Sequence, residues 1–201
     1  MRKISMVIIA LMAIMILPTI KADAAILMDG STTFANADFN AVVYWSVYSP
    51  LDASPLGSIS DYGYYYQVHN SGTGGDNALT QFGVDNPNKL TITGIGYLTT
   101  PNLNPLPGSL IAPNPGYYYD SNNCGVWTFT PGATTQNIPL GSDSYLLYFT
   151  TPYAPVMVNG GVQAGSYNTQ GPVPGPAPEP ASLSLLGISL LGLGSTMFRR
   201  K

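Results

Sequence analysis

Residues that could do acid–base or nucleophilic chemistry are few in this chain. Histidine and cysteine occur once each, as His69 and Cys124, and residues 25–177 contain no glutamate. The carboxylates of that region are eight aspartates beside predicted turns and strand ends: Asp29, Asp38, Asp52, Asp61, Asp76, Asp85, Asp120 and Asp143. A glycosidase needs two facing carboxyl groups, and no serine is framed as Gly-x-Ser-x-Gly for a hydrolase. We therefore expect no catalytic residue and no enzyme activity.

The same residues leave little scope for a metal or a cofactor. Cys124 fits a half-buried small side chain, and the alternatives are a thiol paired with His69 or an intermolecular disulfide. A site built from His and Cys ligands is unsupported because each occurs once. Calcium prefers oxygen ligands, which residues 85–88 and 120–123 supply, but ordinary Asx turns explain both segments equally well. We expect no bound cofactor and no metal.

Charge is distributed unevenly along the chain. Within residues 25–177, eight aspartates face a single cation, Lys89, so the net charge of this region is 1 − 8 = −7. All other Lys and Arg residues lie nearer the two ends, which is why the whole chain has a formal charge of only −3. A region with one cation cannot neutralise a run of phosphates, and this excludes nucleic-acid binding.

The elements that would position these residues are short strands. Between residues 41 and 153, Gly and Pro punctuate runs rich in Tyr, Val, Ile, Phe and Thr, and no helical period appears. The alternation is clearest at 62–70. The other predicted strands are 41–48, 79–84, 90–98, 125–130, 135–140, 144–150 and an edge strand at 155–162, with an irregular loop at 99–115. This spacing predicts an all-β fold, an antiparallel β-sandwich ectodomain over residues 25–164.

Tyrosines are dense in two places, 62–66 and 117–119. Tyrosine suits sandwich strands because its ring packs while its hydroxyl reaches water, so a structural role is the favoured interpretation. The alternative is a carbohydrate-binding module whose rings stack on the sugars of an exopolysaccharide. Its contact residues would be Tyr65, Tyr117, Tyr118 and Tyr119. The two interpretations differ in whether these rings are exposed or buried.

Residues 165–177 differ in composition from the predicted strands. They are rich in Gly and Pro, and proline occupies every second position from 172 to 180. Alternating prolines favour polyproline II, so the segment is predicted to be a semi-rigid stalk between the domain and the C-terminal segment.

The N-terminus has the pattern of an export signal. Arg2 and Lys3 precede an apolar run that leads to small residues at Ala22 and Ala24. This order predicts a signal peptide over residues 1–24, cut by signal peptidase between Ala24 and Ala25 after passage through the secretion machinery. The alternative is an N-terminal membrane helix that is retained.

The C-terminal segment, 178–201, has three parts. Pro178, Glu179 and Pro180 come first, the uncharged apolar run 181–198 follows, and Arg199, Arg200 and Lys201 end the chain. As a helix the run would cover about 27 Å, close to the roughly 30 Å hydrocarbon core of a bilayer. It is therefore predicted to be a single transmembrane helix, and the basic end favours the cytoplasmic side.

In this order of motif, span and basic end, residues 178–201 resemble the PEP-CTERM sorting signal of exported bacterial proteins. Family members are typically secreted by Gram-negative bacteria that make exopolysaccharide. The resemblance implies that an exosortase, a membrane enzyme, recognises the tail and removes or exchanges it. It also implies an inner-membrane intermediate, followed by residence at the cell surface or in the extracellular matrix. A plain single-span anchor is the alternative, although an anchor alone has no use for Pro-Glu-Pro at the mouth of the span.

Overall fold

The computed structural model describes residues 26–72, 77–100, 103, 109–114, 122–131 and 137–177, with residue 123 described by its backbone alone. Several predictions fall outside these residues: the signal peptide and its cleavage site at Ala22, Ala24 and Ala25, the sugar contacts Tyr117, Tyr118 and Tyr119, the motif Pro178, Glu179 and Pro180, the span 181–198, and the basic end Arg199, Arg200 and Lys201. No helix capable of crossing a membrane occurs in the part of the chain that is described.

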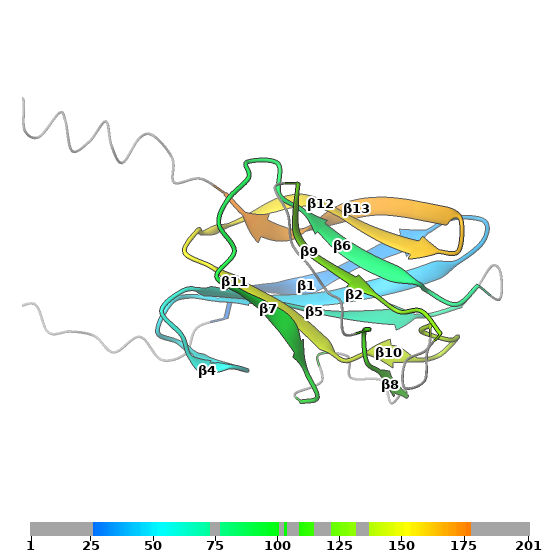
Figure 1. Ribbon diagram of the computed structural model, residues 1–201, viewed down its shortest axis with the longest axis horizontal. Coiled ribbons are helices and arrows are strands. Elements are labelled where there is room, and N and C mark those ends of the chain that lie inside the picture. Colours follow the sequence, from blue (N-terminus) through cyan, green and yellow to red (C-terminus); the bar gives the residue numbers. More distant parts are fainter. Residues whose placement is uncertain are drawn as a thin grey trace, which may run out of the picture.

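The described residues form an all-β fold of two main sheets (Figure 1). The first sheet contains β1 (Ile26–Ala35), β2 (Asn40–Tyr48), β5 (Tyr62–Asn70), β7 (Gly94–Leu98), β8 (Leu110–Ile111), β10 (Asp143–Ser144) and β11 (Leu146–Thr151). The second sheet has the order β13 (Tyr167–Pro176), β12 (Pro155–Ala164), β6 (Gln81–Asp85) and β9 (Asn123–Thr128). A small hairpin joins β3 (Ala53–Ser54) to β4 (Gly57–Ser58).

Antiparallel pairing dominates both sheets. Only β8 and β10 pair in parallel among the strands described. In the first sheet β5 is central, because it pairs with β2 on one side and with β10 and β11 on the other. The prediction of an all-β, antiparallel fold is confirmed.

Aromatic rings from both sheets meet in one core. Tyr66 of β5 lies with its ring centroid 5.4 Å from Phe82 of β6 and 6.3 Å from Trp127 of β9. Phe82 and Trp127 stack at 5.8 Å, and the indole of Trp127 donates a 2.9 Å hydrogen bond to the carbonyl of Gly96 in the first sheet. All three rings are fully buried, so their apolar surface holds the two sheets together.

Some strand predictions need correction. β1 was not predicted, because most of its side chains are exposed and its sequence lacks the alternation of a half-buried strand. The strand expected from residue 90 starts only at Gly94, where the pairing with β11 begins. β12 was expected at an edge, yet it lies between β13 and β6.

The predicted stalk at 165–177 is wrong over most of its length. Residues Tyr167–Pro176 are strand β13, which pairs with β12 without a register shift from Ala164↔Tyr167 to Pro155↔Pro176. The domain therefore extends beyond residue 164, and Pro172, Pro174 and Pro176 belong to an edge strand.

Candidate functional site: the junction at the end of β13

The N–H groups of β13 explain how three prolines fit into its ladder. Ala177 donates a 2.9 Å hydrogen bond from its backbone N to the carbonyl of Ala154, just beyond the last strand pair. Because N–H direction alternates along a strand, residues 171, 173 and 175 also face β12, while the proline nitrogens face the free edge. Proline has no N–H to donate, so an edge strand with its nitrogens turned outward is where it is tolerated.

The carbonyls on that outward side are occupied by side chains of the first sheet. The Thr32 hydroxyl, on β1, donates to the Pro172 carbonyl, and the Tyr66 hydroxyl, on β5, donates to the Pro174 carbonyl. Val173 between them is fully buried in the common core. β13 is thus held by a ladder on one side, by two side-chain hydrogen bonds on the other, and by apolar burial.

Ala177 is the last described residue, and the predicted motif begins at the next position. The fold therefore continues to within one residue of Pro178, and no free stalk lies between them. This geometry could not be read from the sequence, because the prolines indicated an end to regular structure well before residue 177. The clue was the spacing of two, which is also the period of a strand.

Tyr65 does not form the exposed face that sugar stacking requires. Its ring is fully buried, its hydroxyl donates to Ser54 at 2.8 Å, and it packs edge-on against Tyr48 at 5.4 Å. Desolvation by burial raises the pKa of Tyr65 above its usual value. The prediction of Tyr65 as a carbohydrate contact is therefore wrong.

The neighbouring tyrosines of β5 are also core residues. Tyr64 and Tyr66 are fully buried, and Tyr64 stacks on Phe149 with the ring centroids 4.6 Å apart. Burial raises the pKa of both phenols well above the usual value, with smaller contributions from Cys124 and from neighbouring tyrosines. Both hydroxyls donate to backbone carbonyls, those of Tyr153 and Pro174.

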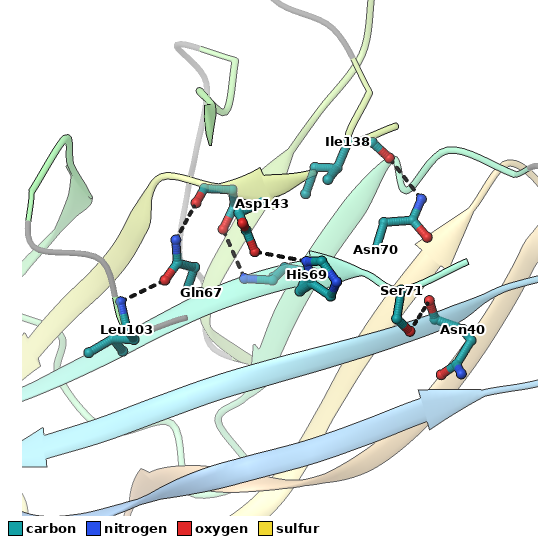
Figure 2. A network of polar contacts seen from close by, with 10 residues as sticks. Asn40, Gln67, His69, Asn70, Ser71, Leu103, Ile138 and Asp143 are labelled. Carbon is teal, nitrogen blue, oxygen red and sulfur yellow. Dashed lines mark hydrogen bonds and ion pairs between the residues drawn. The ribbon is translucent and has the colours of Figure 1, made fainter. Parts of the chain in front are cut away.

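A buried polar network connects β5 to β10 (Figure 2). His69 lies with Nδ1 3.0 Å from a carboxylate oxygen of the fully buried Asp143, and its side chain is 13% exposed. The Gln67 amide donates to the Ser144 carbonyl at 3.1 Å, and its oxygen accepts from the backbone N of Leu103 at 2.7 Å. These contacts fix the register of the short strand β10 beside β5. Sequence reasoning missed the His69–Asp143 pair, because nothing local links residues on separate strands.

Cys124 is a core residue rather than a nucleophile. Its thiol is fully buried and donates to the backbone carbonyl of Asp85 at 3.3 Å. Desolvation raises the pKa of the thiol far above its usual value, so the reactive thiolate is disfavoured. The hydrogen-bond partner of His69 is Asp143, not this thiol.

The loop that follows β6 is a backbone turn, Lys89 N to the Asn86 carbonyl, closed by the Asn86 side chain rather than by an Asx turn. The Asn86 side chain donates from Nδ2 to the Leu90 carbonyl at 2.8 Å and accepts from the Leu90 N at 2.9 Å. Its oxygen is therefore already used within the loop. Among the described residues, no three His, Cys, Asp or Glu side chains gather as a metal site would require.

A comparison with protein-family models gives a match that falls on the junction. Residues 176–201 match the family model described as the PEP-CTERM protein-sorting motif. This match supports an exported protein that passes through a membrane-associated stage and is processed by an exosortase. No curated protein and no solved structure matches the chain.

Proposed function

We propose that this chain is an exported β-sandwich protein that the C-terminal span holds in the inner membrane until an exosortase-like enzyme processes the tail. The protein then resides at the cell surface or in the extracellular matrix, where its role is structural or exopolysaccharide-associated. The observation that carries the proposal is the match of the sorting motif to residues 176–201, at the point where the described fold ends.

The position of the motif suits such processing. The described part of the fold is hydrogen-bonded up to Ala177, and Pro178, Glu179 and Pro180 follow it directly in the sequence, before the apolar span. Glu179 is the only glutamate of the chain, and its charge offers a membrane enzyme one anionic group to bind. A simple anchor would need no such charge, because Arg199, Arg200 and Lys201 already set its orientation.

A structural role for the domain is supported by where its reactive groups lie. Cys124, Tyr64, Tyr65, Tyr66 and Asp143 are all buried and hydrogen-bonded within the fold. The strongly negative net charge of residues 25–177 favours solubility after export.

The deciding experiment is Glu179→Ala, followed by mass determination of the protein recovered from the membrane and from the medium. We expect the variant to insert normally but to remain unprocessed, so that the full-length tail accumulates in the inner membrane. Ser182→Ala is the matched control, since it changes a nearby side chain without removing charge, and it should be processed like the parent. Glu179→Ala protein of parental mass and yield at the surface would contradict the sorting proposal and leave a plain anchor.

A further inference from the structure

The described domain ends only a few residues before the predicted span. Three residues, Pro178 to Pro180, separate the hydrogen-bonded Ala177 from the start of the apolar run. An extended chain covers at most about 3.6 Å per residue, so this link reaches roughly 11 Å. If the tail spans a membrane, the protein surface around Ala177 lies at the level of the lipid headgroups.

That surface carries exposed apolar side chains. Val156 and Met157 pair with Gly175 and Pro174 at the end of the β12–β13 ladder, and their side chains are 43% and 42% exposed. Ile26 and Leu27, also exposed, begin β1, whose first residue pairs with the last residue of β2. Figure 1 shows that β12 begins, β13 ends and β1 begins on the same side of the domain.

The single cation of the domain, Lys89, follows two turn residues that share a hollow with this apolar pair. Lys89 is exposed in the turn after β6, and its backbone N donates to the Asn86 carbonyl at 3.1 Å. Its chain neighbours Pro87 and Asn88 line a hollow together with Val156 and Met157. Asp85 lines the same hollow, and desolvation raises the pKa of its carboxyl.

We propose that this end of the domain is a membrane-contact surface, on which Val156 and Met157 enter the interface of the bilayer and Lys89 binds anionic lipid phosphates. The inference rests on the proposed function, because it requires the tail to be inserted. Two exposed apolar side chains, together with the lysine of that turn, match the chemistry of the lipid interface. Acidic groups also lie towards this end, since Asp29 is exposed near the start of β1 and Asp61 directly precedes β5, whose start is aligned with that of β1 through Tyr48. The approach to the bilayer is therefore assigned to the apolar side chains and the inserted tail, and Lys89 supplies the attraction to anionic lipid.

The test uses the full chain reconstituted in phosphatidylglycerol-containing vesicles, in a Cys124→Ala background. An environment-sensitive fluorophore is attached at Met157→Cys, or at Leu140→Cys as the matched control. Leu140 is 53% exposed and lies at the opposite end of β5, where Gly141 bonds to Asn70. We expect blue-shifted emission and quenching by nitroxide lipids at position 157, and neither at position 140.

Charge is tested with Lys89→Gln. Near an anionic surface one lysine strengthens binding about fivefold. This variant should therefore lower the equilibrium constant for docking of the domain onto phosphatidylglycerol vesicles by about that factor. It should change nothing in phosphatidylcholine vesicles. An equal effect in both lipids would overturn the part assigned to Lys89.

Insertion is measured separately by resistance to alkaline carbonate extraction. A chain that is extracted shows that the proposed function has failed. A chain that is inserted, but whose position 157 is no more quenched than position 140, overturns the membrane-contact surface alone. Burial of position 157 against a second copy, seen as self-transfer between labels without lipid quenching, would overturn it as well.

Discussion

In both β5 and β13 one residue type recurs at every second position, but β5 is a central strand and β13 is an edge strand. β5 has tyrosines at 62, 64 and 66 and lies at the centre of the first sheet, with partners on both sides. β13 has prolines at 172, 174 and 176 and lies at the edge of the second sheet, with one ladder partner. The difference lies in the backbone: a central strand needs every N–H, whereas an edge strand can dispense with alternate ones.

The two strands are also coupled. The Tyr66 hydroxyl of β5 donates to the Pro174 carbonyl of β13, so a carbonyl without a ladder partner is satisfied by a core tyrosine. The prolines protect the edge because they remove the donors that another chain would need for strand addition. The central strand thus contributes to core packing, and β13 ends its sheet without offering N–H donors to a further strand.

The largest effect should come from removing the edge strand altogether. A fragment of residues 25–164 ends where the sequence alone would place the domain boundary, and a fragment of 25–177 includes β13. We expect cooperative unfolding in urea only for the longer fragment, since the shorter one exposes the core that Val173 covers. Equal unfolding midpoints would show that the fold does not need β13 to cover its core.

The next effect belongs to the central strand and appears at high pH. The pKa values of Tyr64 and Tyr66 are raised above the ordinary value of 10.0 in the folded state. Their contribution to the free energy of unfolding is therefore intact below about pH 10. It is lost as the pH rises further, because the phenol hydroxyls lose their protons at lower pH in the unfolded chain than in the folded one. Two such tyrosines lower the free energy of unfolding by about 3 kcal/mol per pH unit above that point.

The measurement is urea unfolding of the 25–177 fragment at a series of alkaline pH values. Tyr64→Phe should remove about half of the slope that these two tyrosines add. A slope unchanged by Tyr64→Phe would show that this phenol is ionised as readily in the folded state as in the unfolded one.

The smallest expected change in unfolding free energy concerns the direction in which the proline nitrogens of β13 point. Thr169 pairs with Val162, and its N–H is on the β12 side, whereas the exposed Gln170 continues the outward series of prolines. Thr169→Pro should cost about 1 to 3 kcal/mol, because it leaves a ladder carbonyl without a donor. Gln170→Pro should be close to neutral in the same urea titration. Similar losses in both variants would mean that the alternation of N–H direction is not what admits proline.

The sequence predicted β5 with the observed bounds, 62–70, because tyrosine and valine alternate there over a full strand. It also predicted the sorting segment, whose signal is local and needs no tertiary context. It failed at β13, since proline is usually a breaker and its compatibility depends on a neighbour, β12, known only after folding. The His69–Asp143 contact failed for a related reason: it joins strands far apart in the chain, and a single sequence gives no pairing information.

The direction in which β13 enters the junction has a mechanical consequence. A force that reaches Ala177 along the axis of β13 meets ladder bonds that run across that axis along a ten-residue strand. The load is therefore applied in shear, and the bonds to β12 resist it together. Tension along that axis is thus shared across the whole strand that precedes the sorting segment.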